Sequence, residues 1–200
     1  MSVAAADTRD RPSRVAVPGQ RPITLWLTGL SGAGKSTLSR QLRAALAARG
    51  MIAATLDGDA LRRGVSRDLG SEPEERTENV RRAAELARLL NDQGLVVIAA
   101  LNTPYRHERA LARSIVGASR FVEVFVSTPL AVCEARDPKG LYRRARAGEV
   151  LGLAGVDSPY ERPTSPAMAV DTGGRTPEQC ADELLRRLMP MIARPPKRGR

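Results

Sequence analysis

Residues Gly29 to Ser36 read GLSGAGKS and follow the spacing G-x-x-x-x-G-K-[ST]. Glycines at these positions let the backbone curl until several amide hydrogens point at phosphate oxygens. Lys35 would reach the β- and γ-phosphates of a nucleoside triphosphate, and the hydroxyl of Ser36 would hold Mg²⁺. An apolar run precedes the motif and a helical pattern starts within it, as a loop of this kind requires. The motif therefore predicts a site that binds and uses MgATP.

A second set of polar residues follows other apolar runs and could bind the molecule that receives a phosphoryl group. Ligands of a parallel α/β sheet sit beyond the carboxyl ends of its strands. A carboxylate there could orient a hydroxyl group, accept its proton or support Mg²⁺, and arginines there suit an anionic acceptor. The residues in these positions are Asp57, Asp59, Arg62, Arg76, Asn79, Asn102, Thr103, Arg106 and Arg109. Arg63, Arg81 and Arg82 are expected to form surface ion pairs instead. His107, the only histidine, is expected to face solvent on a helix.

The elements that must position these residues alternate along the chain. Continuous apolar runs separated by helical patterns indicate a mainly parallel sheet that is covered on both faces. Predicted strands lie at 23–30, 52–57, 95–101, 120–127 and 168–172, and predicted helices lie at 35–50, within 71–94 and at 176–192. We therefore expect an α/β fold, a three-layer sandwich around a mainly parallel five-stranded sheet.

Composition narrows the setting in which this chemistry takes place. The net charge is +10, but residues 1–22 carry +2 and residues 194–200 carry +4, so most of the excess lies at the two ends. No basic surface interleaved with aromatic residues accompanies them, so nucleic acid is not expected as a partner. Cys133 and Cys180 lie in apolar or helical surroundings, which indicates free thiols and a reducing compartment. No run approaches the roughly 20 apolar residues that cross a bilayer, and the first residues lack the apolar block of a secretory signal. We expect a cytoplasmic protein.

With these residues assembled, the chain closely resembles adenylyl-sulfate kinases, which use ATP to phosphorylate the 3′-hydroxyl of adenosine 5′-phosphosulfate. The resemblance covers residues 22–188. It is carried by GLSGAGKST, by LDGD followed by Arg62, by DLG followed by RTENVRR, by TPYRHER, by FVEVFVSTPLAVCEARDPKGLYRRARAGE and by GVDSPYERP. It implies a P-loop NTPase fold of the nucleotide-kinase type, and a homodimer.

The resemblance also implies a role for each matching residue. The ATP-binding residues would be Gly29, Ser31, Gly32, Ala33, Gly34, Lys35, Ser36 and Thr37, with Arg136 and Arg175 toward the adenine. The acceptor nucleotide would be bound by Asp59, Arg62, Arg76, Asn79, Asn102, Thr103 and Leu153, with Lys139 at its phosphosulfate end. Lys35, Asp59, Arg136, Lys139 and Thr103 would take part in catalysis, and Ser36 and Asp57 would hold Mg²⁺.

We expect the chain to consist of one domain and two tails. Residues 22–193 would form the kinase domain, with a disordered tail at 1–21 and a basic tail at 194–200. Within the domain, residues 136–163 would be a mobile lid, rich in arginine, glycine and proline. Closing such a lid over two anionic ligands excludes water, which otherwise competes for the phosphoryl group.

Three positions depart from the family pattern. Ser71 and Leu153 stand where the family commonly has phenylalanines that sandwich the acceptor's adenine, and Thr103 stands where it commonly has serine. Stacking contributes roughly 1–3 kcal/mol per base, so adenine recognition would be altered. Two alternatives to an adenylyl-sulfate kinase follow: a related kinase for another modified nucleotide, and a non-catalytic nucleotide-binding module. The intact Lys35, Ser36, Asp57 and Asp59 argue against the second alternative.

Overall fold

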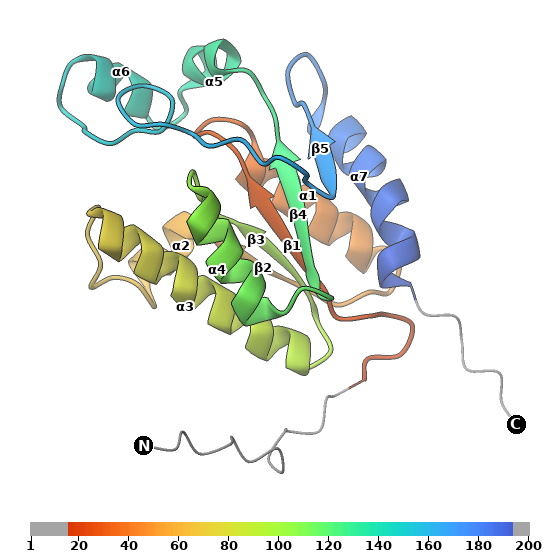
Figure 1. Ribbon diagram of the computed structural model, residues 1–200. Helices are drawn as coiled ribbons and strands as arrows, with labels where there is room; N and C mark the ends of the chain where they lie inside the picture. Colours follow the sequence, from red (N-terminus) through yellow and green to blue (C-terminus); the bar gives the residue numbers. More distant parts are fainter. Residues whose placement is uncertain (1–15, 194–200) are drawn as a thin grey trace, which may run out of the picture.

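The structure is a computed structural model that describes residues 16–193 (Figure 1). Five parallel strands form one sheet in the order β2-β3-β1-β4-β5. The strands are β1 (Thr24–Thr28), β2 (Ala53–Asp57), β3 (Val96–Ala100), β4 (Phe121–Val126) and β5 (Met168–Val170). The predicted five-stranded parallel sheet is confirmed.

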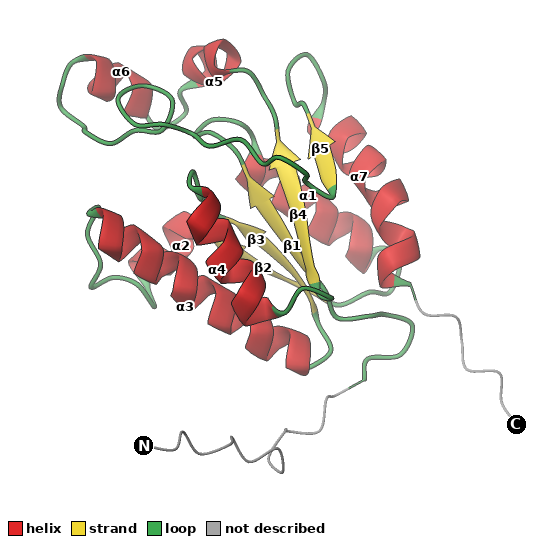
Figure 2. Ribbon diagram, viewed as in Figure 1, coloured by secondary structure: helices red, strands yellow, loops and turns green. Residues whose placement is uncertain are grey.

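Helices cover both faces of this sheet (Figure 2). The helices are α1 (Lys35–Ala47), α2 (Gly58–Arg63), α3 (Pro73–Asp92), α4 (Arg106–Val116), α5 (Leu130–Arg136), α6 (Leu141–Arg146) and α7 (Pro177–Ile192). Successive residues of β1 point to opposite faces, and this alternation separates two apolar cores. Leu25 and Leu27 pack with α1 and α7, whereas Trp26 packs with α3 and α4. The fold is therefore the predicted three-layer sandwich.

The three helices predicted from the sequence, α1, α3 and α7, are present, whereas α4 was not among the predicted helices. Thr176 caps α7, because its hydroxyl accepts a hydrogen bond from the Gln179 amide at 3.2 Å, and Pro177 takes the first helical position. The predicted helix at 35–50 ends at Ala47. The short helices α2 and α5 were not predicted, since six or seven residues do not repeat an apolar period.

The folded part begins earlier than the predicted boundary at residue 22. Gln20 is buried, and its side-chain amide donates to the carbonyls of Gly94 at 2.8 Å and Ile52 at 3.1 Å. The Ile52 amide donates back to Gln20 at 2.8 Å. The Gln20 side chain thus satisfies three backbone groups just before β2 and β3, which fixes the position of residue 20 against the sheet. Gln20 and Arg21, whose amide donates to the Ile192 carbonyl at 2.6 Å, therefore belong to the folded part, although the predicted boundary places them in the tail. Residues 1–15 and the predicted basic tail 194–200 lie outside the described residues.

The predicted lid segment crosses the carboxyl ends of β1 and β4 (Figures 1 and 2). It runs from the end of α5 through α6 and then through irregular chain to residue 163. Its loop is tied to itself by Asp157, whose carboxylate accepts hydrogen bonds from the amides of Gly152 at 2.6 Å and Leu153 at 2.7 Å. That this segment moves stays a prediction. Among residues 16–193, no helix combines the length and the apolar character needed to span a membrane.

Candidate active site

A cleft of about 910 Å³ lies between the carboxyl ends of the strands and the lid segment. Its walls come from the phosphate loop, from the ends of β2 and β3, from α3 and from the lid. The predicted site residues that line it are Ser31, Gly32, Gly34, Lys35, Ser36, Thr37, Asp57, Asp59, Arg62, Arg76, Asn79, Asn102, Arg136, Lys139, Leu153 and Arg175. The structure thus brings the two predicted halves of the site, for ATP and for the acceptor, into one continuous cleft.

The phosphate loop presents the start of α1 to this cleft. Gly34 precedes the helix in a left-handed conformation, and no side chain caps the first amides of α1. Gly32 is required by space as well as by its φ of +74°, because a Cβ there would lie 2.8 Å from the Cys133 carbonyl oxygen. Free amides and the helix dipole at this end favour an anion such as a phosphate group.

Lys35 lies inside the loop and points along it. Its ammonium group donates to the carbonyls of Gly29 at 2.7 Å and Leu30 at 2.8 Å. Loss of hydration inside the loop lowers the pKa of Lys35 from 10.5 to about 8. Burial therefore destabilises the charged form of Lys35, and the negative charge of a bound phosphate would offset that destabilisation.

This lowered pKa predicts a pH dependence of ATP binding. Lys35 is charged below pH 8, and above it the free protein loses that charge, so ATP must bind together with a proton. We expect the association constant to fall by up to about tenfold per pH unit above pH 8. Calorimetric titration with ATP from pH 7 to pH 10, in buffers of different ionisation enthalpy, measures both effects. An affinity that stays flat and a proton uptake that stays at zero up to pH 10 would contradict this assignment.

Ser36 and Asp57 place two oxygens beside the first turn of α1. The Ser36 hydroxyl donates to an Asp57 carboxylate oxygen at 2.6 Å, and the amides of Asp59 and Ala60 donate to the other at 3.0 and 3.3 Å. Burial alone would raise the pKa of Asp57, but these hydrogen bonds outweigh it and lower the pKa. Nowhere in residues 16–193 do three His, Cys, Asp or Glu side chains gather as a metal cage. Two oxygens fit Mg²⁺, which takes its remaining ligands from phosphates and water.

On the acceptor side, a carboxylate and a lysine meet across the cleft. Asp59, in the first turn of α2, forms an ion pair with Lys139 of the lid segment. Both side chains are about half exposed, so the pair adds little stability and can open. It joins two residues that are 80 positions apart and that we expected at the reacting centre.

Two arginines of this side are held by backbone carbonyls. Arg62 donates to the carbonyl of Gly70 at 2.6 Å. Arg76 donates to the carbonyls of Ser71 at 2.8 Å and Gly152 at 3.0 Å, and so links α3 to the lid segment. Both guanidinium groups line the cleft, where they suit an anionic acceptor. Asn79 is buried beside them, and its side-chain oxygen has no hydrogen-bond partner among the described residues.

The contact between Arg76 and Gly152 predicts the effect of one added methyl group. A Cβ at Gly152 would lie 2.6 Å from a terminal nitrogen of Arg76, so Gly152→Ala must displace that guanidinium. We expect the KM for the acceptor to rise about tenfold, equivalent to about 1.4 kcal/mol, while the KM for ATP stays within about twofold. Gly148→Ala is the matched control, because its φ of +74° equals that of Gly152 within a degree and its Cβ would meet nothing within 4 Å. If both variants change the acceptor KM alike, backbone strain rather than Arg76 is responsible.

The ATP end of the cleft is closed by Arg136 and Arg175. Arg136 donates to the Thr172 hydroxyl at 2.8 Å and to its carbonyl at 2.7 Å. Arg175 forms an ion pair with Glu183 of α7 at 2.7 Å. Sequence reasoning missed Thr172, although it follows the last strand by two residues and the rule about strand ends applies to it as well.

Thr103 requires a correction. Its side chain is fully buried, and its hydroxyl accepts from the Trp26 indole at 3.2 Å and donates to the Thr28 hydroxyl at 3.1 Å. It does not line the cleft. A buried hydroxyl must find partners inside the protein, and these partners turn it toward the core. Thr103 therefore supports the floor of the cleft instead of facing a nucleotide.

Two arginines expected on the acceptor edge also lie elsewhere. Arg109 is buried, forms an ion pair with Glu123 at 2.8 Å and donates to the Glu161 carbonyl at 2.6 Å. Arg106 donates weakly to a backbone carbonyl at 3.4 Å on the protein surface. Neither lines the cleft, so both fasten the end of the lid segment rather than bind a ligand. Gly29 and Ala33 contribute carbonyl oxygens to the loop but do not line the cleft either.

Of the remaining expectations about single residues, most are confirmed and one is wrong. Arg81 and Arg82 form the predicted surface ion pairs, whereas Arg63 is exposed and pairs with none of residues 16–193. His107 is exposed on α4, as predicted. Both cysteines are buried free thiols, which confirms that the chain is not a disulfide scaffold.

Known proteins share both the sequence and the fold. The sequence profile of the adenylylsulphate kinase family matches residues 21–171. Adenylyl-sulfate kinase of Aeromonas hydrophila is 51% identical over 176 residues, which are 88% of this chain and 89% of that one. The APS kinase of Mycobacterium tuberculosis, solved with AMPPNP and APS, is 44% identical with a TM-score of 0.80, over 84% of this chain and 98% of that one. A hexameric APS kinase from Thiobacillus denitrificans is 31% identical with a TM-score of 0.64, over 85% of this chain and 29% of that one. The chain belongs to the adenylyl-sulfate kinase family.

Proposed function

We propose that this protein transfers the γ-phosphoryl group of ATP to the 3′-hydroxyl of adenosine 5′-phosphosulfate, giving 3′-phosphoadenosine 5′-phosphosulfate and ADP. One observation carries the proposal: the phosphate loop and the arginine-lined side open into the same cleft. The family assignment and the Mycobacterium relative, solved with an ATP analogue and APS, support it.

On the ATP side, the chain's own groups bind and orient the triphosphate. The amides of residues 31–37 would surround the phosphates, and Lys35 would leave its two carbonyl partners to contact the β- and γ-phosphates. Ser36 and Asp57 would hold Mg²⁺, which supplies positive charge to the phosphate oxygens. Arg136 and Arg175 would bound the adenine.

On the acceptor side, Asp59 would orient the 3′-hydroxyl and receive its proton. The hydroxyl oxygen forms a bond to the γ-phosphorus as the bond from that phosphorus to the bridging β–γ oxygen breaks, and ADP carries away the electron pair. Lys139 would balance the charge of the moving phosphoryl group, so it must exchange its partner Asp59 for phosphate oxygens. Arg62, Arg76, Asn79 and Asn102 would hold the phosphosulfate nucleotide.

The identity of the acceptor base rests on apolar contacts. Ser71 and Leu153 line the acceptor side, and no aromatic residue among residues 16–193 lines the cleft. Leu153 is 7% exposed and belongs to the apolar core around α1 and α7, so it presents only an edge to a base. Leu153 can offer a base an apolar contact but not the stacking of an aromatic ring, so we expect the acceptor's adenine to bind less tightly than between two phenylalanines. The relatives named adenylyl-sulfate kinase, one of them solved with APS, support adenosine 5′-phosphosulfate as the acceptor.

An acceptor panel tests the proposal. ADP formation would be followed with adenosine 5′-phosphosulfate, guanosine 5′-phosphosulfate, AMP and adenosine 5′-phosphoramidate, and the product would be identified by phosphorus NMR. We expect the highest kcat/KM with adenosine 5′-phosphosulfate and a new phosphate on the 3′-oxygen. A higher kcat/KM with another acceptor, or ADP formation that needs no acceptor, would refute it.

The assembly and the location of the protein belong to the same proposal. A homodimer in the cytoplasm is what the family resemblance and the two free thiols favour. Light scattering of the purified chain would give its mass, and a mass other than twice that of the 21.5 kDa chain would rule out the dimer.

A further inference from the structure

The loop between α2 and α3, residues 64–72, carries part of the acceptor wall and is held by polar contacts, such as that of the Glu72 amide with the Glu75 carboxylate, rather than by apolar packing. It contains no helix or strand, and among its side chains only Ser66 is buried. Of its two large apolar residues, Val65 is 54% exposed and Leu69 is only partly buried. Its own backbone hydrogen bonds close local turns, such as those from the Ser66 amide to Leu61 and from the Leu69 amide to Ser66. Apolar burial therefore does not fix the position of this α2–α3 loop.

The position of this loop matters because two arginines that line the cleft donate hydrogen bonds to its carbonyl groups. Arg62 donates to the carbonyls of Leu69 at 3.3 Å and Gly70 at 2.6 Å. Arg76 donates to the carbonyl of Ser71 at 2.8 Å. If the loop moved, both guanidinium groups and the Ser71 wall would move with it.

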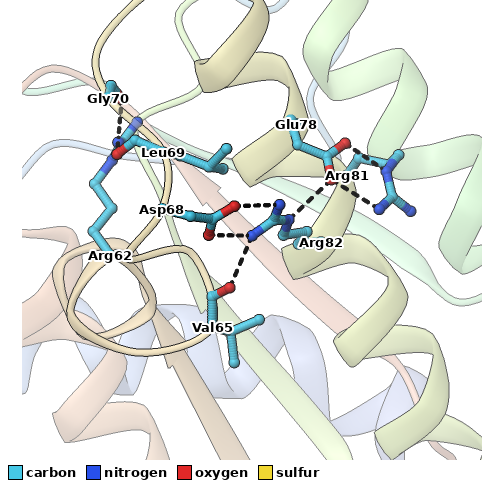
Figure 3. Close-up of polar contacts among 8 residues, drawn as sticks. All are labelled: Arg62, Val65, Asp68, Leu69, Gly70, Glu78, Arg81 and Arg82. Carbon is cyan, nitrogen blue, oxygen red and sulfur yellow. Dashed lines mark hydrogen bonds and ion pairs between the residues drawn. The ribbon is translucent and has the colours of Figure 1, made fainter.

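Arg82, on the outer face of α3, ties the other half of the loop down (Figure 3). Its terminal nitrogens donate to the two Asp68 carboxylate oxygens at 2.6 and 2.8 Å, and one of them also reaches the Val65 carbonyl at 2.9 Å. Its Nε donates to Glu78 at 2.9 Å, one turn back on the same helix. Only the planar fork of an arginine can make all these bonds at once.

The electrostatics keep this arrangement ionised. Hydrogen bonds from Arg81 and Arg82 lower the pKa of Glu78 to about 2. The Arg82 side chain also lowers the pKa of Asp68, and the two carboxylates raise that of Arg82. An isolated ion pair at the surface contributes little to stability. A bidentate pair within a network of four charges keeps its geometry better. Asp68, Glu78 and Arg82 are therefore all charged at neutral pH, and the network is ionised there.

We propose that Arg82 is a positioning residue for acceptor binding: it holds residues 65–68 of the α2–α3 loop so that Arg62, Arg76 and Ser71 face the acceptor. Arg82 itself does not line the cleft. The inference rests on the proposed function, since it concerns the acceptor half of that site.

Kinetics of Arg82→Ala test the proposal. We expect the KM for adenosine 5′-phosphosulfate to rise about tenfold, equivalent to about 1.4 kcal/mol, with the KM for ATP within about twofold of the wild type. Arg82→Lys keeps the charge but loses the fork, so it should recover only part of the acceptor affinity. Asp68→Asn removes the partner from the loop side and should act in the same direction. Because Asp68 is exposed, that variant also tests the proposal if Arg82→Ala fails to fold.

Arg81→Ala is the matched control. It removes the same charge one position away on the same helix, but Arg81 bonds only to Glu78 and not to the loop. We expect its acceptor KM to stay within about twofold of the wild type. Equal increases in the two alanine variants would mean that the general positive field attracts the acceptor, and the proposal would be wrong. A rise in both KM values of Arg82→Ala, or a lower melting temperature with unchanged KM values, would also overturn it.

Hydrogen exchange separates this inference from the proposed function. The amides of residues 65–70 should exchange faster in Arg82→Ala than in Arg81→Ala, with no nucleotide added. If the wild type shows no turnover with adenosine 5′-phosphosulfate, the proposed function fails while the exchange still tests the role of Arg82. If exchange at residues 65–70 is equal in the two variants, the positioning role fails whatever the acceptor is.

Discussion

Lys35→Ala is expected to reduce kcat at least about 1000-fold while the protein stays folded. Removal of a single preorganised donor to a developing negative charge costs about that much in other enzymes, and the proposed role of Lys35 puts a full positive charge beside the group that is transferred. The lysine is poised for this role, because its ammonium group is held within the loop by the carbonyls of Gly29 and Leu30. Stability should change little, since burial already disfavours its charged form. Steady-state assays and thermal melts measure the two quantities separately.

The control for Lys35→Ala is Arg43→Ala. Arg43 is an exposed cation on the same helix α1 and does not line the cleft. Its replacement removes the same charge from the same element and should leave kcat within about twofold. Near-normal turnover by Lys35→Ala, or an equal loss in both variants, would refute the role of the lysine.

Asp59→Asn is expected to lower kcat by about 100-fold or more, with the KM for ATP changed by less than about threefold. An amide has nearly the shape of the carboxylate but cannot accept the proton of the 3′-hydroxyl, and general-base contributions are of this size. Asp59 lies on the proposed acceptor side, and the proposed ATP contacts come from the phosphate loop. A loss confined to the chemical step is therefore the signature of its role.

Asp59→Asn also removes the ion-pair partner of Lys139 and one negative charge. A second variant controls for the loss of that charge. Glu149→Gln neutralises an exposed carboxylate of the lid segment that pairs with Arg144 and does not line the cleft. We expect it to turn over at the wild-type rate. If Asp59→Asn keeps its kcat, the carboxylate takes no proton, and if its main effect is on the KM for ATP, Asp59 belongs to the other half of the site.

The local parts of this site were predictable from the sequence. The phosphate loop is a contiguous motif in which the glycines allow the backbone to curl. Gly32 is required both because its φ is positive and because a Cβ there would clash with the Cys133 carbonyl oxygen. The buried strands were predictable because they are continuous apolar runs, as expected for strands with both faces covered. The capping residue Thr176 marked the start of α7 because a helix start has a chemical requirement of its own.

What could not be predicted depends on contacts between distant segments. Nothing near Thr103 in the sequence says that its hydroxyl turns toward Thr28, 75 residues earlier. Arg109 looks like a ligand-binding arginine until its partner Glu123 is known. Arg82 was correctly expected to form a surface ion pair, but its bond to the Val65 carbonyl, which joins it to the acceptor wall, appears only in three dimensions.

The central claim is that one cleft holds two nucleotides end to end, and a crystal structure with a non-hydrolysable ATP analogue and adenosine 5′-phosphosulfate tests it most directly. We predict the triphosphate on residues 31–37, the sulfated nucleotide between Arg62 and Arg76, and the 3′-oxygen in line with the γ-phosphorus beside Asp59. A sulfated nucleotide bound outside this cleft, or one whose 3′-oxygen points away from the γ-phosphate, would contradict the claim.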